Sequence, residues 1–166
     1  NKNIFFIIKK FKSPVLKKRI KSLGFKKILE LKEWKPYKIN KDLTVTIVPQ
    51  ISNNNEDIES AIEYDLDTSI IIKCNNLNKI FYNNVDNPLA TKHIKKIKDF
   101  VKKKFKKNID VASFNIGAAS EYPQCFLNIN RNLERKKIIE GSFKNVFKKI
   151  RILNCNLFFQ SGGSYK

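Results

Sequence analysis

Short apolar runs of strand length alternate along this chain with two longer segments of helical periodicity. Runs such as 4–8 and 70–72 are too short for core helices and are rich in the β-branched and aromatic residues that strands favour. The segments 89–105 and 132–152 instead repeat their apolar residues every three to four positions. Both kinds of element in one chain predict an α/β or α+β fold, in which helices pack outside mixed sheets.

Turn and capping residues divide the chain between these elements. Ser13-Pro14 predicts the start of a helix that Gly24 ends. Residues 75–78 predict a hairpin turn, and residues 50–67 form a long polar segment that holds six of the 15 acidic residues. The expected strands are 4–8, 25–31, 37–39, 43–48, 68–74, 79–83, 109–114 and 157–159. The expected helices are 15–23, 89–105 and 132–152, with a bend at Gly141.

The charge of the chain is strongly positive, and two explanations of it stay open. The formal net charge is +19, which invites a nucleic-acid partner. However, the basic residues are nearly all lysine, and abundant Lys, Asn and Ile are what an AT-rich genome produces. Arginine, which recognises phosphates and bases best, is scarce. The sequence therefore favours a solvated lysine surface over a dedicated nucleic-acid face.

Length and composition indicate a globular protein of one domain, residues 1–166. No apolar run approaches the roughly 20 residues of a membrane helix, and no secretory signal is visible. Cys74, Cys125 and Cys155 are far apart, which supports neither a disulfide framework nor a zinc knuckle. We expect Cys74 and Cys155 to be small buried residues, and these features together predict a cytoplasmic protein.

Three places could carry chemistry, and each also has an ordinary structural explanation. Asp86 follows a strand and is either a turn residue or a metal ligand. Asp65 and Asp67 precede the expected strand 68–74 and are either cation ligands or part of a solvated acidic loop. The stretch 117–123 is either a substrate loop or a plain strand-to-helix connection. Ser120 has no triad partner, because the single histidine, His93, is expected on the surface of a lysine-rich helix.

Several stretches together resemble the metallo-β-lactamase superfamily. They are Asp-Leu-Asp-Thr-Ser-Ile-Ile-Ile at 65–72, Tyr-Asn-Asn-Val-Asp-Asn-Pro-Leu at 82–89, Ile-Asp at 109–110, Gly-Ala-Ala-Ser-Glu-Tyr-Pro at 117–123 and the opening passage 13–31. The branch that they resemble contains ascorbate-6-phosphate lactonase-like proteins and CMP-N-acetylneuraminate hydroxylase-like domains, whose bacterial members occur near sugar-modification genes. The resemblance spans most of the chain and rests on the order and spacing of the motifs.

The resemblance implies an αββα sandwich with a metal site at one edge. It makes Asp86 the aspartate that binds zinc or iron, as catalytic and metal residue. Asn83 matches an asparagine often seen before that aspartate, whereas Val85 departs from the polar residue that some members carry. The substrate side would then be lined by Asp67, Ser69, Asn83, Gly117, Ser120, Glu121 and Tyr122.

One departure from the family pattern is decisive for function. In the family, the His-x-His-x-Asp-His metal motif precedes all the stretches that match here. This chain does not contain the motif and has a single histidine. A catalytic zinc needs about three protein ligands. The chain opens at Asn1 inside an apolar run and ends just after a Ser-Gly-Gly-Ser stretch, so we expect an incomplete domain whose N-terminal metal part and C-terminal end are missing.

The expected function is part of a metal-dependent hydrolase or hydroxylase-like protein acting on a small molecule, such as a sugar or sugar nucleotide. We expect the 166 residues alone to be inactive. The alternative is a non-catalytic basic module that binds nucleic acid or an anionic polysaccharide through the lysine-rich segment 92–107.

Overall fold

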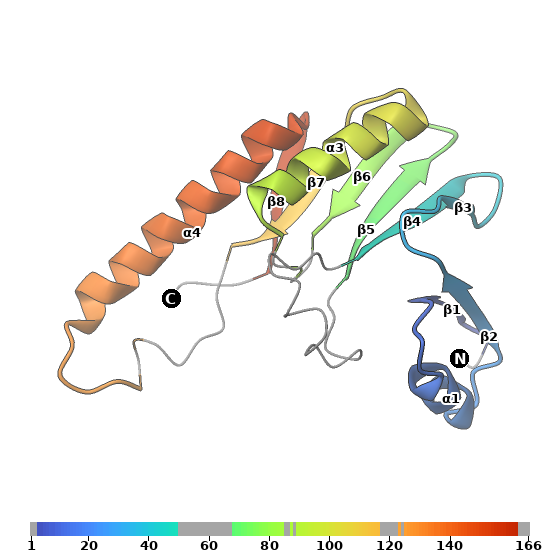
Figure 1. Cartoon of the computed structure of the whole chain (residues 1–166), viewed down its shortest axis with the longest axis horizontal. Helices are drawn as coiled ribbons and strands as arrows, with labels where there is room; N and C mark the ends of the chain where they lie inside the picture. Colours follow the sequence, from blue (N-terminus) through green and yellow to red (C-terminus); the bar gives the residue numbers. More distant parts are fainter. Residues whose placement is uncertain are drawn as a thin grey trace.

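A computed structural model describes residues 3–49, 68–84, 87, 89–116, 123 and 125–162, and it has mixed α and β structure (Figure 1). Helices and strands follow one another along the whole described chain. The strands are β1 (Phe5–Lys9), β2 (Lys27–Leu31), β3 (Tyr37–Lys38), β4 (Leu43–Pro49), β5 (Thr68–Cys74), β6 (Lys79–Asn83), β7 (Val111–Asn115) and β8 (Leu157–Gly162). The helices are α1 (Val15–Ser22), α3 (Thr91–Phe105) and α4 (Arg131–Leu153).

The main sheet has six strands in the order β3-β4-β5-β6-β7-β8. Its first half is antiparallel, since β3, β4, β5 and β6 pair as successive antiparallel neighbours. Its second half is parallel, because α3 crosses over from β6 to β7 and α4 from β7 to β8. The carboxyl ends of β6, β7 and β8 therefore lie at the same end of the sheet.

Helices α3 and α4 cover one face of this sheet and enclose the larger core (Figure 1). Ile94, Ile97 and Val101 from α3 are fully buried there. They contact the inward side chains of the central strands, such as Ile71 and Ile80, in one cluster. The apolar residues spaced three and four apart along α3 thus pack against the alternate, inward-facing residues of the strands.

A small second sheet lies against the other face of β4 and β5. It consists of β1 and β2, which are parallel and are connected by α1. Leu31 is 2% exposed and packs with Val45 and Ile47 of β4 in a second core. The opening strand–helix–strand unit predicted from the sequence is therefore present.

The same face of the main sheet is apolar farther along, at β6, β7 and β8. Phe81 and Phe159 stack with ring centroids 5.9 Å apart. Phe159 remains 45% exposed and Leu157 60% exposed. The second core includes no residue of β6, β7 or β8, so the described part of the small sheet covers only the β4–β5 half of the face.

Most predicted elements are confirmed, with boundaries that differ by a few residues. The hairpin turn at 75–78 joins β5 to β6, and Pro49 is the last residue of β4 instead of lying beyond it. Helix α4 continues through Gly141 as one element, and the bend predicted there stays a prediction.

Two expectations about burial were wrong in whole or in part. His93 is not a surface residue but is 7% exposed, because it lies on the buried arc of α3 beside Ile94 and Ile97. Cys74 and Cys155 are half-buried instead of buried, and all three cysteines are free thiols. Within the described ranges, no helix is both long and apolar enough to span a bilayer.

Candidate functional site

Five strands end or begin together at one end of the main sheet, which we call the carboxyl end. Pro49 at the end of β4 pairs with Thr68 at the start of β5. Asn83 ends β6, and Asn115 of β7 pairs with Gly162 of β8. Since ligands of sheets with parallel strands bind beyond the carboxyl ends of those strands, this end is the natural position for a site.

A buried polar network lies at this end and consists of Ser69, Tyr82, Asn84 and Asn87. All four residues are at most 5% exposed. The Tyr82 hydroxyl donates to Asn84 Oδ1 at 2.7 Å and lies 3.3 Å from Ser69 Oγ. The Asn87 side-chain amide donates to Ser69 Oγ at 3.2 Å and to the Pro49 carbonyl at 3.3 Å. The network therefore joins β4, β5 and β6 through side chains.

Backbone bonds complete the network on either side of position 86. The Asn84 side-chain amide donates to the Asn87 carbonyl at 2.8 Å, and the Asn87 N–H donates to the Asn84 carbonyl at 3.1 Å. The Asn84 N–H donates to the carbonyl of Ser113 in β7 at 2.9 Å. The chain is thus fixed immediately before and after the two residues that separate Asn84 from Asn87.

The chemistry of this network is that of neutral groups. Burial raises the pKa of Tyr82 far above its ordinary value, although the hydrogen bond with Ser69 lowers it in part, so the phenol stays protonated and can donate. Both Asn87 Nδ2 contacts are with acceptors, which fixes the orientation of its amide. Its Oδ1 is then a buried acceptor without a hydrogen-bond partner among the described residues.

The structure places two of the predicted site residues and only one of them in the network. Ser69 is 1% exposed and bonds to Tyr82 and Asn87. Asn83 follows Tyr82 in β6 and therefore lies on the opposite face of the sheet. The remaining predicted residues lie outside the described ranges, and they are Asp67, Asp86, Gly117, Ser120, Glu121 and Tyr122.

Sequence reasoning missed Asn84 and Asn87 as members of this site. The available signal was the run Asn83-Asn84-Val85-Asp86-Asn87, which holds more asparagine than a single turn requires. Asparagine is frequent throughout the chain, and this concealed that signal.

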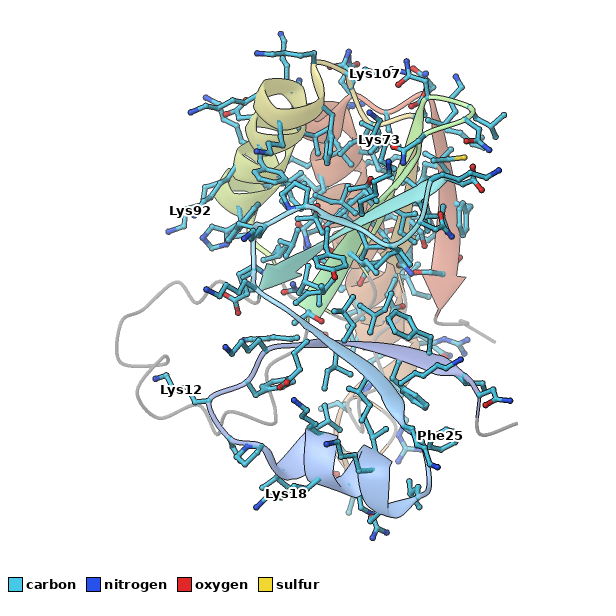
Figure 2. The ribbon with its side chains drawn as sticks, turned by 90° about the vertical axis from the view of Figure 1, so that its right-hand side faces the viewer. Lys12, Lys18, Phe25, Lys73, Lys92 and Lys107 are labelled. Atoms are coloured by element: carbon cyan, nitrogen blue, oxygen red, sulfur yellow. The ribbon has the colours of Figure 1, made fainter. Side chains whose placement is uncertain are left out.

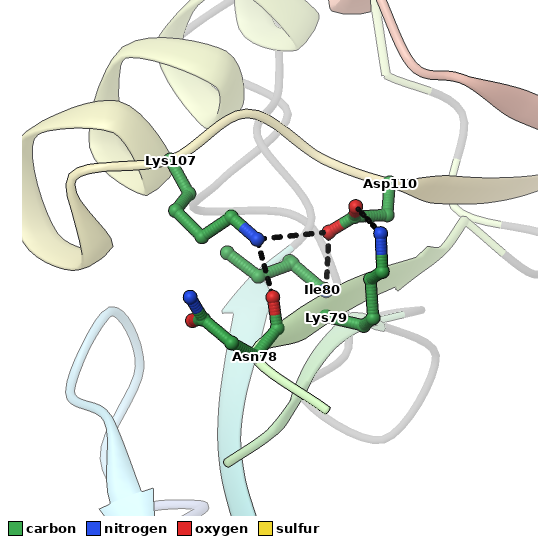
Figure 3. A network of polar contacts seen from close by, with 5 residues as sticks. All are labelled: Asn78, Lys79, Ile80, Lys107 and Asp110. Carbon is green, nitrogen blue, oxygen red and sulfur yellow. Dashed lines mark hydrogen bonds and ion pairs between the residues drawn. The ribbon is translucent and has the colours of Figure 1, made fainter. Parts of the chain in front are cut away.

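The acidic residue Asp110 lies at the opposite end of the sheet and has a structural role (Figure 3). Its carboxylate accepts from the Ile80 N–H at 2.9 Å and from Lys79 Nζ at 3.0 Å, and Lys107 Nζ lies 3.9 Å away. Burial alone would raise the pKa of Asp110, but these hydrogen bonds and lysine charges lower it below its ordinary value. Asp110 therefore braces the starts of β6 and β7 as a carboxylate.

The described residues do not by themselves supply the ligands of a zinc or iron site. No three His, Cys, Asp or Glu side chains gather within the described ranges. At the carboxyl end, Ser69, Tyr82, Asn84 and Asn87 offer neutral oxygens and amides, whereas catalytic zinc takes imidazole, thiolate or carboxylate ligands. His93 lies on α3 in contact with the core and belongs to no such group.

Comparisons with known proteins give a fold likeness and nothing closer. No model of a known protein family matches the sequence, and no curated protein matches it. The chain is similar in structure to isothiocyanate hydrolase from Delia radicum gut bacteria, with a TM-score of 0.56 and 15% sequence identity. The match covers 98% of this chain and 54% of that one, so the chain spans about half the length of this structural neighbour.

Proposed function

We propose that this chain is part of a hydrolase or hydroxylase-like protein with the metallo-β-lactamase fold, and that its active site is at the carboxyl end of the main sheet. The observation that carries the proposal is the buried network of Ser69, Tyr82, Asn84 and Asn87. Burying such polar groups is unfavourable unless each is bonded, so a sheet end that needed only a turn would not require them. Between Asn84 and Asn87 the sequence holds Asp86, the one carboxylate of the run 79–89.

Two further observations support this proposal. The layers formed by α3 and α4, the main sheet and the β1–β2 sheet correspond in order to three layers of an αββα sandwich. A structural neighbour of the chain is named as a hydrolase. In the proposal, Asp86 serves as metal ligand, and Asp67, Ser69 and the 117–122 segment line the substrate side, which takes a small molecule such as a sugar derivative.

In this proposal the ligands of the His-x-His-x-Asp-His motif come from outside these 166 residues. The chain has one histidine, and His93 is buried in the core. We therefore expect the chain alone to bind zinc and iron at well below one equivalent and to hydrolyse no lactone or ester substrate. Stoichiometric tight zinc or iron in the isolated chain would contradict this part of the proposal.

The full protein, as its gene encodes it, provides the test of Asp86. We expect one or two equivalents of zinc or iron by elemental analysis of the purified protein. Asp86→Asn should lower the metal affinity at least tenfold, because a charged ligand is lost. The matched control is Asp110→Asn, which removes a carboxylate at the opposite end of the sheet and should leave the metal content unchanged. Equal metal affinity of wild type and Asp86→Asn, measured by competition with a chelator, would overturn the proposal.

A further inference from the structure

The solvent face of α3 carries a stripe that is rich in lysine. The exposed lysines of this stripe are Lys92, Lys95, Lys96, Lys102, Lys103 and Lys106 at the helix end, whereas Lys104 is exposed on another side of the helix. At 3.6 residues per turn they fall on the side opposite the buried Ile94, Ile97 and Val101. Lys92 points away from the sheet in Figure 2. Asp99, the one acidic residue of the helix, is exposed within this stripe, three or four residues from Lys95, Lys96, Lys102 and Lys103.

These six lysines form no ion pair with any residue that the structure describes. The lysine ion pairs of the helix region involve Lys107, which bonds to Asp110 beyond the helix. Lys92 with Lys96 and Lys102 with Lys106 are instead like charges four residues apart. Such pairs destabilise a helix by about 0.2–0.5 kcal/mol each. The helix therefore carries a repulsion that an external anion would relieve.

Helix α4 carries its positive charge at a lower density. Lys137 pairs with Glu134 at 2.6 Å and Lys136 lies 3.9 Å from Glu140. Lys144 and Lys148 are exposed and belong to none of the ion pairs of the described residues. The 15 residues of α3 hold seven lysines and one acidic residue, whereas the 23 residues of α4 hold five lysines, three arginines and two acidic residues. Of these two helices, α3 therefore has the denser positive surface.

We propose that the outer face of α3 binds the phosphate backbone of a nucleic-acid duplex without sequence preference. From Lys92 to Lys106 the stripe extends about 21 Å at 1.5 Å per residue. A duplex carries one charge per 1.7 Å or so of axis, so several phosphates lie within that length. Lysine binds phosphate as a point charge, whereas the arginine that reads base edges is absent from α3.

The test uses fluorescence anisotropy of a 20-base-pair duplex of mixed sequence at 50 and 200 mM salt. We expect binding to weaken with a slope of log K against log salt of about −4, as for four or five phosphates neutralised. The variant Lys95→Gln/Lys102→Gln/Lys103→Gln should bind at least tenfold more weakly at 50 mM salt and reduce the slope by about 3.

The matched control is Lys136→Gln/Lys137→Gln/Lys144→Gln, which removes the same charge from exposed positions of α4. It should bind within twofold of wild type. Equal losses in both variants would overturn the proposal, since binding would then follow net charge. Failure of wild type to bind at 50 mM salt would do the same, as would tighter binding of a carboxylated polysaccharide than of the duplex.

A measurement on wild type alone covers the case in which a triple variant does not fold. Duplex that binds the folded chain and not the unfolded one raises the unfolding temperature, and the rise grows with the logarithm of its concentration above Kd. We expect that rise at 50 mM salt and its disappearance at 500 mM salt. An unfolding temperature unaffected by duplex at 50 mM salt contradicts the proposal.

Discussion

Asp110 illustrates how a single carboxylate can hold several strands together. Its oxygens accept from the backbone of Ile80 and from Lys79, while its own carbonyl accepts from the N–H groups of Asn156 and Leu157. One residue thus satisfies donors of β6 and of the chain entering β8. Hydrogen bonds to a charged group contribute about 1.5–3 kcal/mol each when a partner is removed.

Asp110→Asn should lower the free energy of unfolding at pH 7 by about 2 kcal/mol, because the charge-assisted bonds weaken. The folded-state pKa of Asp110 lies below its ordinary value, so its stabilisation is present above the unfolded pKa of about 3.9 and is lost as pH falls through the lower folded value. Urea unfolding at pH 7 and pH 2 measures this, and the gap between wild type and variant should be smaller at pH 2 than at pH 7.

Asp99→Asn is the control, since Asp99 is exposed on α3 and makes no ion pair within the described ranges. It should change the unfolding free energy by less than about 0.5 kcal/mol at either pH. An Asp110→Asn effect as small as that of Asp99→Asn would show that the carboxylate does not brace the strands.

His93 should make the fold sensitive to mild acid. Burial lowers the pKa of His93, and the charges of Lys92 and Lys96 lower it further. The stability it contributes is therefore complete above the unfolded pKa of about 6.5 and decreases as pH falls below it. We expect the urea midpoint of wild type to drop between pH 7.5 and 5.5, and that of His93→Gln to drop less. Parallel decreases in both proteins would exclude His93 as the cause.

At the scale of elements, both long helices end in a left-handed residue. Lys106 ends α3 with φ of 56°, and Asn154 ends α4 with φ of 54°. In each case the residue's N–H bonds to the carbonyl four positions earlier, Lys102 and Ile150 respectively. Asparagine tolerates this conformation, whereas lysine does so with strain, and glycine is the usual residue.

Lys106→Gly should therefore raise the free energy of unfolding by about 0.5–1 kcal/mol, since relief of the strain exceeds the entropy lost by glycine. Asn154→Gly is the comparison and should change stability by a few tenths of a kcal/mol at most. Denaturant titration of the three proteins at pH 7 distinguishes them. A larger gain at Asn154 than at Lys106 would refute the strain argument.

The elements themselves were largely predictable, because their signals are local. Ile70, Ile71 and Ile72 with the asparagine-rich turn after them were sufficient for the β5–β6 hairpin. Burial of His93 was missed because the lysines around it suggested a solvent-exposed side. The signal was present in the spacing, since His93 lies four residues before Ile97 and therefore beside the apolar stripe of α3.

At the scale of the whole molecule, the two cores should differ in how easily they open. Leu31→Ala removes a buried side chain from the second core and should cost about 2–5 kcal/mol locally. Amide hydrogen exchange should then accelerate in β1 and β2, and much less in β6 and β7. The comparison is Leu153→Ala, which removes an equally buried leucine from the main core. Equal acceleration of β6 in both variants would show one cooperative unit instead of two.

The arrangement of the main sheet could not be predicted from sequence, and this limits the site as well. The parallel pairing of β6 with β7 and of β7 with β8 joins residues some 30 to 45 positions apart, such as Phe81 with Val111 and Val111 with Leu157. No local pattern fixes such a register. For the same reason Ser69 was assigned to the substrate side from resemblance, while its bonds to Tyr82 and Asn87 required the folded sheet.

The bare apolar face of β6 to β8 has a consequence for how the protein behaves in solution. Phe159 and Leu157 remain exposed on a molecule whose formal charge is +19. Two molecules therefore attract each other through these apolar faces and repel each other through their positive charge. The repulsion extends about 30 Å at 0.01 M salt and only about 3 Å at 1 M. Colloidal stability should therefore be greatest in dilute buffers, and concentrated salt should bring these faces together and precipitate the protein.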